Sequence, residues 1–245
     1  MFHPDGPTFF ELARQALSST ERGYNLLAPK FEWTPFRTPD VVLQAAAPII
    51  GEVDDALDLC CGTGAAMAML RPLCRRRVVG VDFSQGMLEE ARRRYLQDGQ
   101  DLQDKDAFVL VHGDVFDVDY ENEFDVVTCF GACGHILPGQ QRRFLDIVYR
   151  ALRPGGRFVF ATAARPPLWS PRLWLAAGFD ASMIVRNIFW RPPFHMYYLA
   201  FLLSRARRLL LESGYEVEVH TGYCDAFPRL SLVVASKPGQ RSALP

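Results

Sequence analysis

The pattern of apolar positions changes along this chain of 245 residues. In the first fifty residues they recur at helical spacing, over 9–18 and 41–47, and we expect Pro48 to end the second helix. From Ala56 onward, short and nearly continuous apolar runs alternate with amphipathic segments. This alternation is typical of a parallel sheet covered by helices on both faces. The predicted strands are 56–59, 77–81, 108–112, 124–129, 157–161, 215–220 and 230–235, and the main predicted helices are 65–73, 85–96, 140–152 and 199–213.

One segment interrupts the alternation. Residues 165–198 are rich in proline and aromatic side chains, and the segment is longer than an ordinary connection in an α/β domain. Such insertions usually serve a function, so we expect a lid or an interface here.

Composition and charge make several function classes unfavourable. The formal net charge is -1 and the pI is about 6.5, so no overall positive field would attract nucleic acid or an anionic membrane. The six cysteines show neither a C-x-x-C pair nor a disulfide framework, which favours free thiols in a cytoplasmic protein and no metal site. The N-terminus shows no signal-peptide pattern, and the most apolar helical window, 194–203, is too short to span a membrane.

The polar residues after the predicted strands define the candidate chemistry. Asp58, Asp82 and Asp114 each lie at or just after the end of a strand, and Gly62 and Gly64 form a tight turn before a helix. In open α/β sheets, ligands bind at the carboxyl ends of the strands. Carboxylates with no lysine beside them would repel a pyrophosphate. We therefore expect a ligand that is cationic, or rich in hydroxyl and amino donors.

With these residues in place, the sequence resembles the class I S-adenosylmethionine-dependent methyltransferases, specifically their small-molecule branch. The resemblance covers about 56–161. Cys60 departs from it, because the family more often has glycine there, but cysteine is small and we expect the turn to survive. The matching stretches, in order, are 58–64 (DLCCGTG), 79–88 (VGVDFSQGML), 113–115 (GDV), 124–127 (FDVV) and 152–156 (LRPGG).

The resemblance implies a Rossmann-like, mostly parallel seven-stranded sheet with helices on both faces, and S-adenosyl-L-methionine as the cofactor. Length and a hydrophobic content of 49% favour one large α/β domain over two small ones, so we expect a single methyltransferase domain over residues 1–245. Its parts would be a helical N-terminal cap (1–50), a cofactor-binding core (51–164), a lid insertion on the acceptor side (165–203), and a terminal helix, strands and tail (204–245).

Candidate site residues follow from the same resemblance. Asp58 would lie near the methionine ammonium and Asp82 would accept from both ribose hydroxyls. Taken singly, either could simply cap a turn. The other cofactor-binding candidates are Gly62 and Gly64 beside the methionine portion, Cys60 in the turn, Phe83 and Met87 at the adenine faces, Asp114 and Val115 at the adenine edge, Phe130 and Gly131 beside the sulfonium, and Tyr24, with Arg37, from the N-terminal side.

Methyl transfer from a sulfonium depends on alignment more than on covalent catalysis. A general base is needed only for a weak nucleophile such as a hydroxyl or carbon acid. His135, after the fourth strand, is the best-placed candidate, although it could instead cap a helix or bond the backbone. The aromatic insertion suggests an apolar or aromatic small molecule as methyl acceptor, with a homodimer interface or a plain structural cover as the competing roles.

Two other functions stay open. A non-catalytic member would bind the cofactor as a sensor or scaffold and keep the same acidic residues. A nicotinamide-dependent oxidoreductase is disfavoured because Met67 replaces the third glycine of G-x-G-x-x-G. A nucleic-acid methyltransferase is also disfavoured, since the chain has no basic tract and no Asn/Asp-Pro-Pro-aromatic motif after the fourth strand. We thus expect a small-molecule partner, no nucleic acid and no membrane span.

Overall fold

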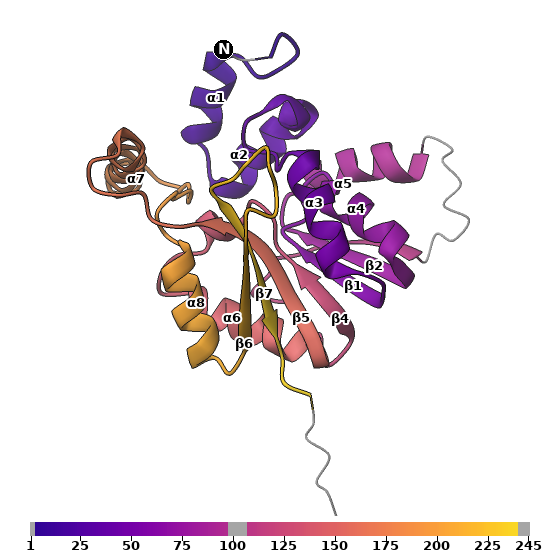
Figure 1. Cartoon of the computed structure of the whole chain (residues 1–245). Helices are drawn as coiled ribbons and strands as arrows, with labels where there is room; N and C mark the ends of the chain where they lie inside the picture. Colours follow the sequence, from indigo (N-terminus) through magenta and orange to yellow (C-terminus); the bar gives the residue numbers. More distant parts are fainter. Residues whose placement is uncertain (1–2, 98–106, 240–245) are drawn as a thin grey trace, which may run out of the picture.

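A seven-stranded sheet forms the centre of the computed structural model, which describes residues 3–97 and 107–239 (Figure 1). The strand order is β3-β2-β1-β4-β5-β7-β6, and only β7 runs antiparallel to its neighbours. This confirms the mostly parallel Rossmann-like sheet. The bounds are β1 Val53–Leu59, β2 Cys74–Asp82, β3 Phe108–His112, β4 Phe124–Thr128, β5 Leu152–Ala163, β6 Glu216–Thr221 and β7 Leu230–Ser236.

Helices cover both faces of this sheet. On one face lie α3 (Asp40–Ile50), α4 (Ala65–Leu70) and α5 (Gln85–Arg92), and on the other lie α6 (Gln141–Ala151) and α8 (Leu203–Glu212). Short helical turns extend or link them: η1 Ala28–Trp33, η2 Arg71–Leu73, η3 Arg93–Gln97 and η5 Cys133–His135. None of the helices in the described part of the chain is long and apolar enough to cross a membrane.

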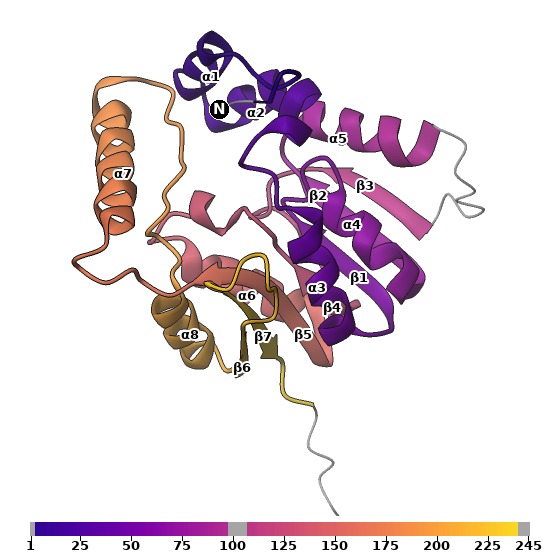
Figure 2. The same cartoon turned by 45° about the horizontal axis from the view of Figure 1, so that its top comes forward.

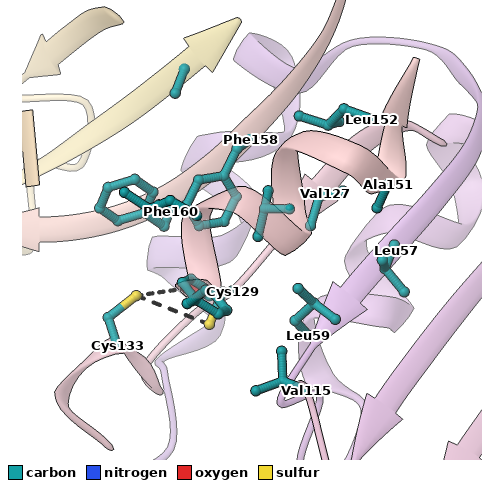
Figure 3. Close-up of a cluster of buried hydrophobic side chains, with 14 of the residues drawn as sticks. Leu57, Leu59, Val115, Val127, Cys129, Cys133, Ala151, Leu152, Phe158 and Phe160 are labelled. Atoms are coloured by element: carbon teal, nitrogen blue, oxygen red, sulfur yellow. Dashed lines mark hydrogen bonds between the residues drawn. The ribbon is translucent and has the colours of Figure 1, made fainter. Parts of the chain in front are cut away.

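The strands alternate between two apolar cores. On β1, Leu57 and Leu59 pack into the cluster that contains α6 and α8, whereas Ala56 belongs to the cluster beneath α3 and α4. Figure 3 shows part of the first cluster, where Phe158 and Phe160 of β5 stack with ring centroids 4.8 Å apart. Because both faces are buried, the strands read as nearly continuous apolar runs.

Two segments of the chain lie above the carboxyl edge of the sheet. The N-terminal segment forms α1 (Phe9–Ala16) and α2 (Thr20–Leu27), and the insertion contains α7 (Pro171–Phe189) (Figures 1 and 2). The sequence indicated no regular element at α7, although Ser170 and Pro171 are favourable residues for a helix start.

The expectation that Pro48 ends the second helix is wrong. Pro48 lies inside α3, which continues to Ile50 and stops at Gly51, whose φ is +67°. Pro48 sacrifices one helical hydrogen bond, but Leu43 and Ile50 lie on either side of it in the same apolar core. Tertiary packing therefore outweighs the local signal.

The crossing of β2 and α4 gives a test of this packing. A Cβ atom added to Gly80 would lie 2.1 Å from Met67 Sδ and 2.9 Å from Cys61 Sγ. We expect Gly80→Ala to lower the free energy of unfolding by about 1–3 kcal/mol, because the buried Met67 side chain must move. Urea unfolding is the measurement. Gly113→Ala is the matched control, since nothing lies within 4 Å of its added Cβ. Equal stability of the two variants would contradict this packing.

Candidate active site

A cavity opens at the carboxyl ends of β1, β2 and β4, where the strand order reverses between β1 and β4. It encloses about 730 Å³ of space between atoms, including the part open to solvent. Its floor comes from the sheet and its roof from the N-terminal segment. The lining residues are Tyr24, Phe31, Phe36, Arg37, Thr38, Leu43, Asp58, Cys60, Cys61, Gly62, Thr63, Ala65, Ala66, Asp82, Phe83, Met87, Phe130, Gly131, Ala132 and His135.

The glycine turn after β1 forms as expected. Gly62 and Gly64 have φ values of +55° and +85°, a region that glycine enters without strain. Cys60 also adopts a positive φ, +56°, so the turn keeps a left-handed residue where the resemblance expects glycine. Gly64 directly precedes α4 and does not line the cavity; its added Cβ would meet Tyr95 at 3.1 Å.

Asp82 is held by the same turn. The backbone N–H of Gly62 donates to Asp82 Oδ2 and that of Ser84 to Oδ1, both at 2.8 Å. The carboxylate is therefore fixed in orientation, and each oxygen keeps a free lone pair. Burial raises the pKa of Asp82 to about 6, and the two backbone bonds oppose that rise.

Asp58 lies beside it at the end of β1 and is almost fully buried. Thr128 Oγ1 on β4 donates to Asp58 Oδ1 at 2.7 Å. Burial raises the pKa of Asp58 to about 7, and the charge of Asp82 adds to this effect. Within the described residues, neither carboxylate forms an ion pair with a lysine or arginine.

The opposite edge of the sheet provides the contrast. Asp55, also buried and three residues before Asp58 on β1, forms ion pairs with Arg76, Arg77 and Arg153. Near one end of β1 the buried acid Asp55 is paired with arginines, and near the other end the buried acid Asp58 has no ion pair. A buried carboxylate without a cation is costly, so its presence at a cavity indicates a ligand that supplies the positive charge.

A second hollow adjoins the first and shares Cys60, Asp82, Phe83 and His135 with it. Asp114 and Val115 line this second hollow. Asp114 is exposed, and its Oδ1 accepts the backbone N–H of Phe116 at 2.9 Å, so it closes a local turn. Its place in the hollow leaves its other oxygen available to a ligand.

The structure thus gathers most of the predicted site residues at one cavity. Tyr24, Asp58, Cys60, Gly62, Asp82, Phe83, Met87, Phe130, Gly131 and His135 line the main hollow, Asp114 and Val115 line the adjoining one, and Gly64 lies behind the turn.

Several lining residues carried no sequence signal. Phe31, Phe36 and Thr38 enter from η1 and the loop after it, which contain no motif. The sequence suggested Arg37 only alongside Tyr24, as a residue that reaches the cofactor from the N-terminal side. In the structure Arg37 lines the cavity and forms ion pairs with Glu32 at 2.7 Å and Asp40 at 2.6 Å. Only the fold places this segment over the turn.

The best candidate for acid–base chemistry is a pair. Tyr24 Oη on α2 and His135 Nε2 on η5 lie 2.6 Å apart, and His135 Nδ1 lies 3.2 Å from the carbonyl oxygen of Ala132. Burial lowers the pKa of His135 to about 4, so the ring is neutral at pH 7. Burial and the charge of Asp82 raise the pKa of Tyr24. A neutral ring that donates from Nδ1 to Ala132 would accept the tyrosine proton at Nε2.

The aromatic insertion, residues 165–198, contacts this pair. Phe194 stacks on Tyr24 with ring centroids 6.2 Å apart, and the N–H of Tyr197 donates to the carbonyl of Gly134 at 2.9 Å. The N–H of His195 donates to Thr20 Oγ1 at 2.9 Å. The N-terminal segment, the loop after β4 and the insertion therefore meet at His135.

Comparison with known proteins agrees with this geometry. Residues 56–156 match the family model described as a methyltransferase domain. Demethylmenaquinone methyltransferase from Clavibacter sepedonicus is 39% identical over 127 residues, which cover 51% of this chain and 46% of the relative. These residues form a class I methyltransferase domain. The resemblance noted in the sequence is thereby confirmed at the level of the family.

Solved structures extend the likeness of the methyltransferase fold over the whole chain. The DhpI–SAH complex has a TM-score of 0.64 at 21% identity and covers 96% of this chain and 100% of its own. Phosphoethanolamine N-methyltransferase 2 from Haemonchus contortus, in complex with S-adenosyl-L-methionine, has a TM-score of 0.58 at 17% identity, with 81% and 52% covered. By contrast, the chain spans about half the length of the curated relatives it matches.

The unpaired carboxylate of this methyltransferase domain predicts an unusual pH dependence. Since the folded-state pKa of Asp58, about 7, lies above the ordinary value of 3.8, the folded state holds a proton that the unfolded chain has already released. Its contribution to stability is fully present below about pH 4 and is lost as the pH rises through 7. Relative to Asp58→Asn, the wild type should lose on the order of 4 kcal/mol across this range.

Urea unfolding at a series of pH values measures the difference. Asp54→Asn is the control: Asp54 is a partly exposed acid of β1, lies outside the cavity and pairs with Arg76 at 4.0 Å, and the profile of this variant should run parallel to that of the wild type. Parallel profiles for Asp58→Asn and the wild type would contradict an unpaired buried carboxylate.

Proposed function

We propose that this protein transfers the methyl group of S-adenosyl-L-methionine to a small apolar or aromatic molecule. The observation that supports this most is the pair of cavity acids, Asp58 and Asp82, buried with no cation from the described chain. The cofactor carries an ammonium, a sulfonium and a ribose diol, which match the charge and hydrogen-bonding needs of these two groups.

The chain's own residues fit each part of that cofactor. Asp82, with both oxygens oriented by backbone donors, would accept from the two ribose hydroxyls. Asp58 would face the ammonium, and Arg37 at the same cavity would face the small carboxylate. Asp114, Val115, Phe83 and Met87 would bind the adenine, while Gly62, Phe130 and Gly131 would line the methionine portion and the methyl group.

The acceptor side of the cavity supports an apolar substrate. Tyr24, Phe31, Phe36 and Phe130 contribute four aromatic rings to the lining of the cavity. A ring-shaped acceptor would pack against such rings. The relatives named demethylmenaquinone methyltransferase agree with this interpretation, although they match about half of this chain.

Bound at this site, the cofactor would supply an electrophilic methyl group, and the protein would align the acceptor with it in a dry cavity. Such alignment contributes about 7–11 kcal/mol to barrier reduction in well-oriented systems. An acceptor hydroxyl or carbon acid must also lose a proton. The Tyr24 oxygen would take that proton while its own moves to His135 Nε2, over the 2.6 Å bond already present.

Cofactor binding is tested by calorimetric titration with S-adenosylmethionine, S-adenosylhomocysteine and NAD. We expect both adenosyl ligands to bind and NAD not to bind. Asp82→Asn should weaken binding by about 10- to 100-fold, because two charge-assisted hydrogen bonds are lost. Asp54→Asn is the matched control. Binding of NAD alone would contradict the proposal. In the wild type, affinity should increase from roughly pH 6 to pH 8 as Asp58 and Asp82 ionise.

Catalysis is tested with a panel of phenols, quinols and polar amines and radiolabelled cofactor. His135→Gln should lower kcat by about 10²- to 10⁴-fold on hydroxyl or carbon-acid acceptors, while the cofactor affinity changes only a few-fold. Methylation of polar amines alone would contradict the apolar acceptor. Normal cofactor binding with no transfer to any acceptor would favour a sensor or scaffold.

A further inference from the structure

The outer face of α7 is apolar, although it faces solvent. A surface helix ordinarily turns its apolar stripe toward the core. Leu173 and Met183 of α7 are buried in this way. Leu175 and Phe189 of the same helix, however, are 78% and 82% exposed. The other large exposed apolar residues at or near this helix are Leu168, Trp169, Trp174, Ile184, Val185, Ile188 and Trp190. Together these nine residues form what we call the α7 face; Figure 2 shows the helix standing at the periphery of the molecule.

Positive charge flanks this face. Residues 165–191 contain four arginines and a single acid, while the whole chain has a formal net charge of -1. Arg165, Arg172 and Arg191 are exposed. The acid is Asp180, whose carboxylate accepts hydrogen bonds from the backbone N–H groups of Tyr198 and Leu199 at 2.8 and 3.0 Å. Its charge is therefore already engaged by the segment that follows α7.

We infer that the α7 face docks on the surface of an anionic lipid bilayer. A helix with exposed tryptophan, phenylalanine and leucine, flanked by arginine, matches both layers of that surface: apolar side chains enter the acyl boundary, and arginines pair with lipid phosphates. A second copy of the chain fits less well. Face-to-face contact would bring the two sets of arginines together, and this segment offers no unengaged acid to pair with them.

This docking would serve the proposed function, on which its biological role rests. Asn187 on α7 exchanges two hydrogen bonds with the backbone of Phe194, both 2.9 Å long, and Phe194 stacks on Tyr24 in the cavity wall. The docked helix is therefore joined to the acceptor side of the site through one residue. An apolar acceptor dissolved in the bilayer would then lie close to the segment that packs against the cavity wall.

Vesicle sedimentation of the full chain, without cofactor or acceptor, tests the inference. We expect binding to vesicles of phosphatidylcholine mixed with phosphatidylserine. Leu175→Glu should weaken that binding at least about tenfold, because it puts a charge in the apolar face. Leu211→Glu is the matched control: the same substitution at an exposed leucine of α8, which should bind like the wild type.

Two further experiments separate the electrostatic attraction to the lipids from the entry of side chains into the bilayer. In the double variant Arg165→Gln/Arg172→Gln, the affinity for vesicles that contain phosphatidylserine should fall about fivefold per arginine. The affinity for vesicles of phosphatidylcholine alone should fall much less. Trp169, Trp174 and Trp190 are three of the four tryptophans. In the Trp33→Phe background, their fluorescence should shift to the blue on vesicle addition, since all three belong to the α7 face.

Absence of vesicle binding would overturn the inference, as would an equal loss for Leu175→Glu and Leu211→Glu. A dimer in analytical ultracentrifugation that Leu175→Glu dissociates would assign the face to a second copy and overturn it as well. These outcomes do not depend on the cofactor. A failed calorimetric titration would contradict the proposed function and leave vesicle binding unchanged.

Discussion

Two buried carboxylates that lack a cation govern the architecture of this site. Asp58 and Asp82 end neighbouring parallel strands, and the register that pairs Leu59 with Val81 brings them to one edge of the sheet. Their raised pKa values express the cost of burying negative charge in a poorly solvated place. Such groups occur in proteins where a bound ligand offsets the desolvation of the carboxylates. The stability of the fold and the affinity for the ligand therefore depend on the same two side chains.

The backbone around these acids is organised to hold them. A left-handed turn at Cys60 and Gly62 directs the Gly62 N–H at Asp82, and the cap of α5 directs the Ser84 N–H at its other oxygen. The donors are part of the chain itself and need no rearrangement when a ligand arrives. The site is therefore preorganised on its cofactor side.

The part of the cavity proposed to hold the acceptor is built differently. Three segments distant in sequence meet at His135: α2 through Tyr24, the insertion through Phe194 and Tyr197, and the loop after β4 itself. These contacts are the hydrogen bond between Tyr24 and His135, the stacking of Phe194 on Tyr24 and a backbone hydrogen bond from Tyr197. Aromatic side chains also line this half of the cavity, which makes it more apolar than the half that holds the two acids. A surface helix on the same insertion, α7, then links the apolar half to the exterior of the molecule.

The sequence by itself determined the alternation of strands and helices, the glycine turn and the acids that follow the strands, because periodicity and backbone conformation are local properties. It could not decide which acid lacks a cation: Asp55 and Asp58 are three residues apart, and only packing gives Asp55 its arginines. Likewise Tyr24 and His135, separated by 111 positions, become a pair only when α2 folds over the sheet. Tertiary structure also extended α3 through Pro48, since buried apolar contacts outweigh a single lost hydrogen bond.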